Sequence, residues 1–141
     1  MAEEKRCWLY TRIDAPEDAR GNLKTQEKVL LDLAAEQNFE VAGTASDLGI
    51  VHGLQRPGIA RVIDAARDHC FEALLIQDIR IISDNIGDAI GFLSYLYDIG
   101  IDTYTRKEGL IDIHEKFREF HKMISHIPES AAGLSQNISI R

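Results

Sequence analysis

One stretch near the start of the chain decides the fold: Trp8-Leu-Tyr-Thr-Arg-Ile-Asp-Ala-Pro-Glu-Asp18. Its apolar beginning, preceded by Cys7, is typical of a buried strand, and the Ala15-Pro16 dipeptide ends any strand there. Arg12 and Asp14 lie where that strand ends. Catalytic and binding groups in open α/β sheets gather beyond the carboxyl ends of the strands, so this stretch predicts a functional site at its polar end.

The chain that follows alternates helices and strands. Apolar residues at helical spacing predict helices over 22–37, 57–69 and 86–99, and short apolar runs predict strands over 39–44, 71–76 and 101–105. The run at 71–76 is the most apolar, as expected for the central strand of a parallel sheet. Alternation of this kind implies right-handed crossovers, so we expect a three-layer α/β domain with about four parallel strands and crossover helices.

The last part of the chain departs from this alternation. Five apolar residues are spaced 3, 4, 3 and 4 apart: Leu110, Ile113, Phe117, Phe120 and Ile124. Such a narrow apolar seam is typical of helix pairing and predicts a dimer interface. We therefore expect a domain over 1–105, a dimerisation helix over 106–127 that ends at Pro128, and a flexible tail over 128–141.

Composition limits the function. The 141 residues suit one domain, and the net charge of −7, from 23 acidic and 16 basic residues, argues against tight DNA binding by this chain alone. No apolar run approaches the roughly 18 residues of a membrane helix, and the N-terminus does not resemble a secretory signal, so we expect no membrane association and a cytoplasmic protein. Cys7 and Cys70 fit reduced thiols. No cluster of metal ligands is apparent, and we expect neither metal nor cofactor.

Several short sequence fragments are informative through their order and spacing. They are Tyr10-Thr-Arg-Ile13, Asn22-Leu-Lys-Thr-Gln26, Asp47-Leu-Gly49, Arg56-Pro-Gly-Ile59 and Ile79–Asn85. Together they resemble the catalytic domain of the serine recombinases, the resolvase/invertase family, over about residues 7–105. The resemblance implies a resolvase-like fold and DNA strand exchange, in which a serine attacks a DNA phosphodiester and forms a covalent 5′-phosphoserine link.

The resemblance also assigns site residues. Asp14 stands at the position of the nucleophilic serine of the family's Tyr-x-Arg-Val-Ser motif. A carboxylate is anionic at neutral pH and repels a phosphodiester, whereas the family has a neutral nucleophile there. Arg12 and Arg56 match two arginines that hold the scissile phosphate. Gln26 matches a family glutamine, and Asp47 is expected to support the site.

A third family cluster, Asp-Arg-Leu-x-Arg, falls on residues 80–84. Its acid corresponds to Arg80, and its two arginines correspond to Ile81 and Asp84. The resemblance therefore implies a retained scaffold with a dismantled site. The family continues into a long helix, which the segment from Leu110 to Ile124 replaces here, and then into a helix-turn-helix domain for which this sequence has no counterpart.

These observations predict a catalytically degenerate recombinase-like domain, acting as a regulatory or protein-interaction module in DNA recombination or mobile elements. We expect a homodimer or higher homo-oligomer, or a hetero-oligomer with an active recombinase. Two alternatives stay open: an active recombinase or phosphoryl-transfer enzyme that uses Asp14 with Arg12 and Arg56, and a receiver-like domain in which Asp14 and Asp47 bind a cation or phosphate. A plain surface salt bridge between Arg12 and Asp14 is the simplest structural explanation of that pair.

Overall fold

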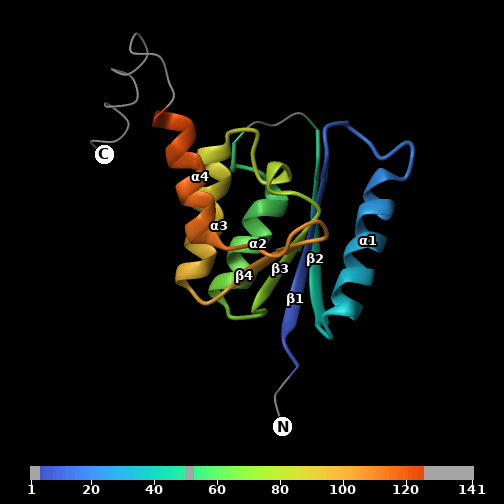
Figure 1. Cartoon of the computed structure of the whole chain (residues 1–141). Helices are drawn as coiled ribbons and strands as arrows, with labels where there is room; N and C mark the ends of the chain where they lie inside the picture. The colour runs from blue at the N-terminus through green and yellow to red at the C-terminus, as the bar shows by residue number, and fades with distance from the viewer. Residues whose placement is uncertain (1–3, 50–52, 126–141) are drawn as a thin grey trace. The chain divides into compact units, whose positions relative to one another are not determined.

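The structure, a computed structural model, describes residues 4–49 and 53–125 (Figure 1). The strands are β1 (Arg6–Ile13), β2 (Glu40–Leu48), β3 (Ala73–Ile76), β4 (Asp102–Thr105) and β5 (Gly109–Leu110). The helices are α1 (Asn22–Glu36), α2 (Pro57–Arg67), α3 (Ile86–Asp98) and α4 (Ile113–Ser125), with a short 3-10 helix, η1, over Ile79–Ile81. The chain divides into two compact units at residues 111 and 112.

The first unit is a three-layer α/β domain. Its sheet has the order β2-β1-β3-β4-β5, in which the first four strands are parallel and β5 is antiparallel to β4. Helix α1 covers one face of the sheet, and α2 and α3 cover the other (Figure 1). Strand β3 is the central strand, and all four of its residues are buried, as its apolar sequence predicts.

The hydrophobic core beneath α1 joins that helix to three strands. Its buried members are Cys7, Leu9, Leu30, Leu33, Ala34, Ala73, Leu75 and Tyr104, with Phe39 packed against them. Burial raises the pKa of the Cys7 thiol to about 11, so this side chain is a neutral core group rather than a reactive thiolate. The core holds the strands in register, and their carboxyl ends therefore meet at one edge of the sheet.

Strands β1 and β2 are longer than the sequence pattern predicts. β1 includes Arg12, and β2 continues past residue 44 to Leu48, so that Arg12 and Asp47 are register partners. The pattern missed these ends because their residues are polar, yet pairing between the strands satisfies their backbone groups. A shift of register between Cys7 and Trp8 brings the Trp8 ring over Gly43, where a β-carbon would lie 2.3 Å from it.

The segment after β4 corrects one expectation. Leu110 does not belong to the predicted helix: it lies in β5 and pairs with Tyr104 of β4. Gly109, with φ of 69°, allows the chain to turn back on β4, a conformation that a pattern of apolar residues does not register. The first unit therefore extends to residue 111 rather than ending at 105.

The second unit contains α4. This helix begins at Ile113, where the Asp112 carboxylate accepts hydrogen bonds from the N–H groups of His114 and Glu115 at 3.0 and 3.1 Å. Ile113, Phe117, Phe120 and Ile124 of the predicted seam all lie within it. The expected tail over 128–141 lies outside the described residues, as do residues 126 and 127 of the expected helix. Within the described ranges, no helix is long and apolar enough to cross a bilayer.

Candidate functional site

Arg12 is a charged residue at the carboxyl end of β1, an interior strand of the sheet, yet only 4% of its side chain is exposed. Gln26 of α1 binds its backbone twice: Oε1 accepts the Arg12 N–H at 3.2 Å, and Nε2 donates to the Arg12 carbonyl at 2.9 Å. These bonds attach the end of β1 to α1. The resemblance gave Gln26 a supporting place at the site, and its contacts fix the backbone from which the Arg12 guanidinium extends.

Asp47, at the end of β2, is the second organising residue. Its carboxylate accepts hydrogen bonds from the Tyr10 hydroxyl at 2.6 Å, the Gly58 N–H at 2.7 Å and the Ile59 N–H at 3.2 Å. Helix α2 has no side-chain cap of its own, so this carboxylate replaces one, and it also lies favourably at the positive end of the helix dipole.

Gly58 makes that approach possible. A β-carbon at this position would lie 2.6 Å from both Asp47 Oδ2 and the Ser46 carbonyl oxygen. Pro57 occupies the first turn of the helix, where its missing N–H leaves no bond unmade. The Arg56-Pro-Gly-Ile59 fragment is therefore a helix start adapted to receive a carboxylate from the neighbouring strand.

Tyr10 lies beneath these groups and is fully buried. Burial first, and then its hydrogen bond to Asp47, raise the pKa of Tyr10 well above its ordinary value, so the hydroxyl remains a hydrogen-bond donor. Sequence reasoning did not assign Tyr10 a site role. A signal was present, because a buried tyrosine hydroxyl in an apolar strand requires a polar partner.

Arg56 precedes α2 and is also buried, with 2% of its side chain exposed. Its Nη2 donates to the Ile82 carbonyl and, at 3.1 Å, to the Ile81 carbonyl. Its Nε lies 3.7 Å from Asp47 Oδ2, close enough for an ion pair but too far for a hydrogen bond. Its guanidinium carbon is 6.0 Å from the centre of the Tyr10 ring. Within the described ranges, Nε and Nη1 of Arg56 donate no hydrogen bond.

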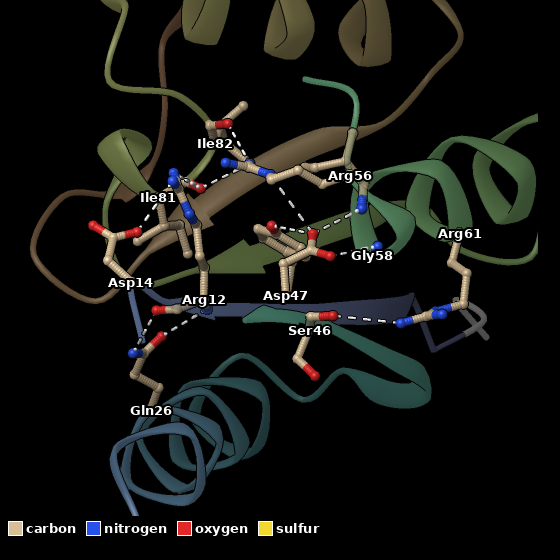
Figure 2. A network of polar contacts seen from close by, with 12 residues as sticks. Arg12, Asp14, Gln26, Ser46, Asp47, Arg56, Gly58, Arg61, Ile81 and Ile82 are labelled. Carbon is tan, nitrogen blue, oxygen red and sulfur yellow. Dashed lines mark hydrogen bonds and ion pairs between the residues drawn. The ribbon is translucent and has the colours of Figure 1, made fainter. Parts of the chain in front are cut away.

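The two arginines converge although they come from different elements. Arg12 Nη1 lies 3.5 Å from the Ile81 carbonyl oxygen, to which Arg56 also donates (Figure 2). The other predicted member, Asp14, places Oδ1 3.1 Å from Arg12 Nη2, but 62% of its side chain is exposed. The acid of this ion pair is therefore exposed to solvent, whereas its arginine is buried.

The loop after β3 contributes backbone atoms rather than side chains. Ile81 provides the carbonyl oxygen that both arginines approach. Arg80 and Asp84 are exposed, and the Arg80 N–H is bound by the Asp78 side chain at 2.9 Å. The sequence showed Ile81 only as the replacement of a family arginine. It could not show the role of the Ile81 carbonyl, because every residue type has a backbone carbonyl.

The described residues form no cluster of metal ligands. In residues 4–49 and 53–125, no group of three or more His, Cys, Asp or Glu side chains is placed to hold a metal ion. Asp47, which the receiver-like alternative would use with Asp14, has its oxygens engaged by one hydroxyl and two N–H groups. The arrangement presents buried cations at the strand ends, which suits the recognition of anionic oxygen.

The fold is shared with catalytic domains of serine recombinases. The N-terminal catalytic domain of TP901-1 integrase matches with a TM-score of 0.70 at 20% identity, over 86% of this chain and 100% of that one. A resolvase family site-specific recombinase from Streptococcus pneumoniae matches with a TM-score of 0.68 at 18% identity, over 96% and 99% of the two chains.

The C-terminal catalytic domain of ISC1926 TnpA, an IS607-like serine recombinase, matches with a TM-score of 0.66 at 15% identity, over 95% of this chain and 96% of that one. At such identities the likeness concerns the fold alone. The family model for the resolvase N-terminal domain, in contrast, matches the sequence itself, over residues 7–137. The chain therefore belongs to the resolvase N-terminal domain family, the family of serine recombinase catalytic domains.

Proposed function

We propose that this protein is a catalytically degenerate member of its family, which regulates DNA recombination or joins a recombinase assembly without cutting DNA itself. The observation that carries the proposal is the end of β1, where the Asp14 carboxylate pairs with the buried Arg12 at 3.1 Å. A carboxylate is a poor nucleophile toward a phosphodiester, because the attack brings two negative charges together. Here the carboxylate is also already paired with the arginine of the site.

The surroundings of the arginines support the same proposal. Transfer of a phosphoryl group depends on hydrogen-bond donors and positive charges aimed at the developing negative charge. Here the loop after β3 turns carbonyl oxygens of Ile81 and Ile82 toward Arg12 and Arg56, and these acceptors engage donors that a phosphate would need. The side chains at Ile81 and Asp84 supply no positive charge in that loop.

Association through α4 is the proposed mode of action. Its apolar residues Ile113, Phe117, Phe120 and Ile124 recur at a spacing of 4, 3 and 4, as in helices that pair. We propose a homodimer, or a hetero-oligomer with an active recombinase, built through this seam. The net charge of −7 favours weak DNA binding by the chain alone, and the partner would then provide DNA affinity. We also propose a cytoplasmic location, as suits a partner of a recombinase.

Catalysis is tested with supercoiled plasmid DNA that carries the sites of an active serine recombinase. The protein is incubated with this DNA, and the 5′ ends are examined for covalently attached protein, with the active recombinase as positive control. The expected result is no adduct from the wild-type chain and none from Asp14→Ala. A wild-type adduct that disappears in Asp14→Ala would show that Asp14 is a working nucleophile, which would refute the proposal.

Association is tested by sedimentation velocity on the full chain. We expect Phe117→Asp to shift the protein toward the monomer, because a charge in an apolar seam opposes pairing. Arg118→Asp, at the adjacent exposed position of α4, is the matched control and should leave the distribution unchanged. An oligomer that withstands Phe117→Asp would exclude the seam as the interface.

A further inference from the structure

Strand β2 forms one edge of the sheet, and this edge is long and regular (Figure 1). From Gly43 to Leu48 each residue has one register partner on β1, whereas β5, at the other edge, has only two residues. Proteins usually protect an edge strand with lysine or proline, with a bulge, or by keeping it short. β2 contains neither lysine nor proline, and its one register shift lies before Gly43. Its outer side is therefore suited to pairing with another strand.

The backbone of β2 presents hydrogen-bonding groups on that outer side. Successive residues of a strand turn their N–H and C=O groups to opposite sides. The Gly49 N–H donates to the Ala15 carbonyl on the β1 side at 2.8 Å, so Thr44 and Ser46 turn their backbone groups outward. The Ser46 carbonyl accepts a long hydrogen bond from Arg61 Nη2, at 3.4 Å and at the surface (Figure 2). Thr44 thus lies near the middle of an edge that a second strand can extend.

One face of this edge carries exposed apolar side chains. Val41 and Leu48 are both exposed. They point to the α1 side of the sheet, because their register partners Cys7 and Ile13 lie on the face of β1 that packs beneath α1. Val41 and Leu48 lie near opposite ends of β2. A second copy that pairs antiparallel therefore brings Val41 of each chain toward Leu48 of the other.

Helix α1 adds a third exposed apolar side chain, Leu31. Five residues further along the helix, Glu36 pairs with Arg106, which follows β4. Because five residues turn a helix by about 140°, Leu31 lies on the opposite flank, toward β2.

The height of Leu31 along the strand follows from Gln26, whose side chain binds the backbone of Arg12, the register partner of Asp47. Leu31 lies about 7.5 Å further along α1, a length of about two strand residues. Leu31 is therefore roughly level with Thr44. A two-fold axis at Thr44 would bring the Leu31 side chains of two copies together.

Charges on the α2 side of the edge are complementary about the same axis. A β-carbon on Gly58 would touch the Ser46 carbonyl, so α2 begins level with the carboxyl end of β2. Arg61 follows after about one turn, and Asp68, which ends the helix, lies about two turns further toward the amino end of β2. Both are exposed, and a spacing of seven residues places them on the same flank. An antiparallel partner reverses their order, so Arg61 of each copy faces Asp68 of the other.

We propose that two copies of this chain pair antiparallel through the outer edge of β2, about a two-fold axis near Thr44, and join their sheets into one. A second copy fits this edge because the axis places apolar side chains beside apolar ones and arginine beside aspartate. The interface belongs to the first compact unit, whereas the α4 seam belongs to the second. The inference therefore goes beyond the proposed function and does not rest on it. Each copy contributes few apolar side chains, so we expect weak pairing that increases with protein concentration.

The test traps the pair covalently at Thr44. Full chains with Thr44→Cys are oxidised with oxidised glutathione and separated by non-reducing electrophoresis. Residues directly opposite in an antiparallel ladder have Cα atoms about 5.5 Å apart or closer, within the range of a disulfide. Thr25→Cys, at an exposed position on the Glu36 flank of α1, is the matched control, and wild type reports on Cys7 and Cys70. We expect at least about tenfold more covalent dimer from Thr44→Cys than from Thr25→Cys, because pairing raises the local thiol concentration.

Equal amounts of covalent dimer from the two variants would overturn the proposal. Addition of Phe117→Asp to Thr44→Cys should leave the amount unchanged. Loss of the covalent dimer in that double variant would assign the contact to the α4 seam, and would also overturn the proposal.

Hydrogen exchange distinguishes pairing of strands from mere contact. In the wild-type chain, exchange of the Thr44 N–H should slow as protein concentration rises, whereas exchange of the Ala45 N–H, which faces β1, should not change. A Thr44 rate that does not depend on concentration would refute the pairing of copies and leave the edge to a strand of another protein. None of these outcomes bears on the DNA adduct assay or on Phe117→Asp alone, so the proposals fail separately.

Discussion

Strand β1 carries an arginine–carboxylate pair at each of its ends, and the two pairs are built differently. At its start, Arg6 contacts both oxygens of Glu72 and also the His69 carbonyl, with 43% and 38% of the two side chains exposed. At its end, Arg12 is 4% exposed and its partner Asp14 is 62% exposed. The first pair shares its exposure between the partners. The second buries the cation and leaves the acid in water.

The difference in exposure distinguishes Arg6 and Glu72, a pair that stabilises the fold, from Arg12, whose burial is not explained by stability. Arg6 and Glu72 link the amino ends of neighbouring parallel strands, and each would be solvated without the other. Arg12 is buried, and Gln26 binds its backbone on both sides. Burying a charge opposes folding, so the cation is explained better by binding than by stability.

The largest effect should come from Asp47, which binds the carboxyl end of the sheet together. Asp47→Asn turns two N–H hydrogens toward groups that now donate to a carboxylate, and it removes the negative charge beside Arg56. We expect a loss of about 3–5 kcal/mol in the free energy of unfolding, measured by urea denaturation. Asp64→Asn, at an exposed position of α2, should change it by less than about 0.5 kcal/mol. Similar losses in both variants would contradict the central place of Asp47.

A pair of glycine substitutions should give effects of opposite sign. Gly58→Ala pushes a methyl group against Asp47 and the Ser46 carbonyl, and should destabilise the protein by about 1–3 kcal/mol. Gly91→Ala lies in α3 with nothing within 4 Å of the new methyl group, and should stabilise it by about 0.5–1 kcal/mol. Thermal unfolding measures both, and a stabilising Gly58→Ala would mean that Asp47 does not hold the start of α2.

The Arg6–Glu72 pair at the start of β1 should make the stability of the protein depend on pH in the acid range. Its hydrogen bond with Arg6 lowers the pKa of Glu72, so the pair contributes stability above the ordinary pKa of glutamate and loses it as the pH falls through the lower, folded value. Because both groups are partly exposed, the contribution should be small. Denaturation midpoints between about pH 6 and pH 3 should therefore fall more steeply for wild type than for Glu72→Gln. Parallel curves would show that the pair adds nothing.

The smallest effect on stability is expected at Asp14. In chloride buffer, Asp14→Asn should change the free energy of unfolding by no more than about 0.5 kcal/mol, because the carboxylate is exposed. A loss of several kcal/mol in the free energy of unfolding would mean that the Arg12–Asp14 pair stabilises the fold. The two ends of β1 would then not differ in this respect.

Much of this architecture could be read from the sequence. The starts of α1, α2 and α3, at Asn22, Pro57 and Ile86, were all predicted from apolar spacing and helix-start signals. The central place of β3 followed from its apolar run. In each of these features the local sequence pattern and the tertiary structure agree, so the spacing of apolar residues predicts the element correctly.

The parts that escaped prediction depend on partners far away in the sequence. Leu110 fits a helical seam by spacing, but pairing with Tyr104 places it in a strand. The Ile81 carbonyl enters the site through a 3-10 helix that no residue type marks. That Asp47 caps α2 required knowing that the end of β2 lies beside the start of that helix. The resemblance placed Arg12 and Arg56 in one site, but their burial and their shared acceptor became visible only in three dimensions.

The bonds between Asp47 and the first turn of α2 have a consequence for how the chain tolerates change. They join residues 11 and 12 positions apart, and thus pin both ends of the connection that leads from β2 to Arg56. Arg56 directly precedes the helix turn that these bonds hold. Residues inserted after Gly53 would add only the small entropy of a longer closed loop. An insertion directly after Gly53 should therefore leave the hydrogen bonds from Gly58 and Ile59 to Asp47 in place.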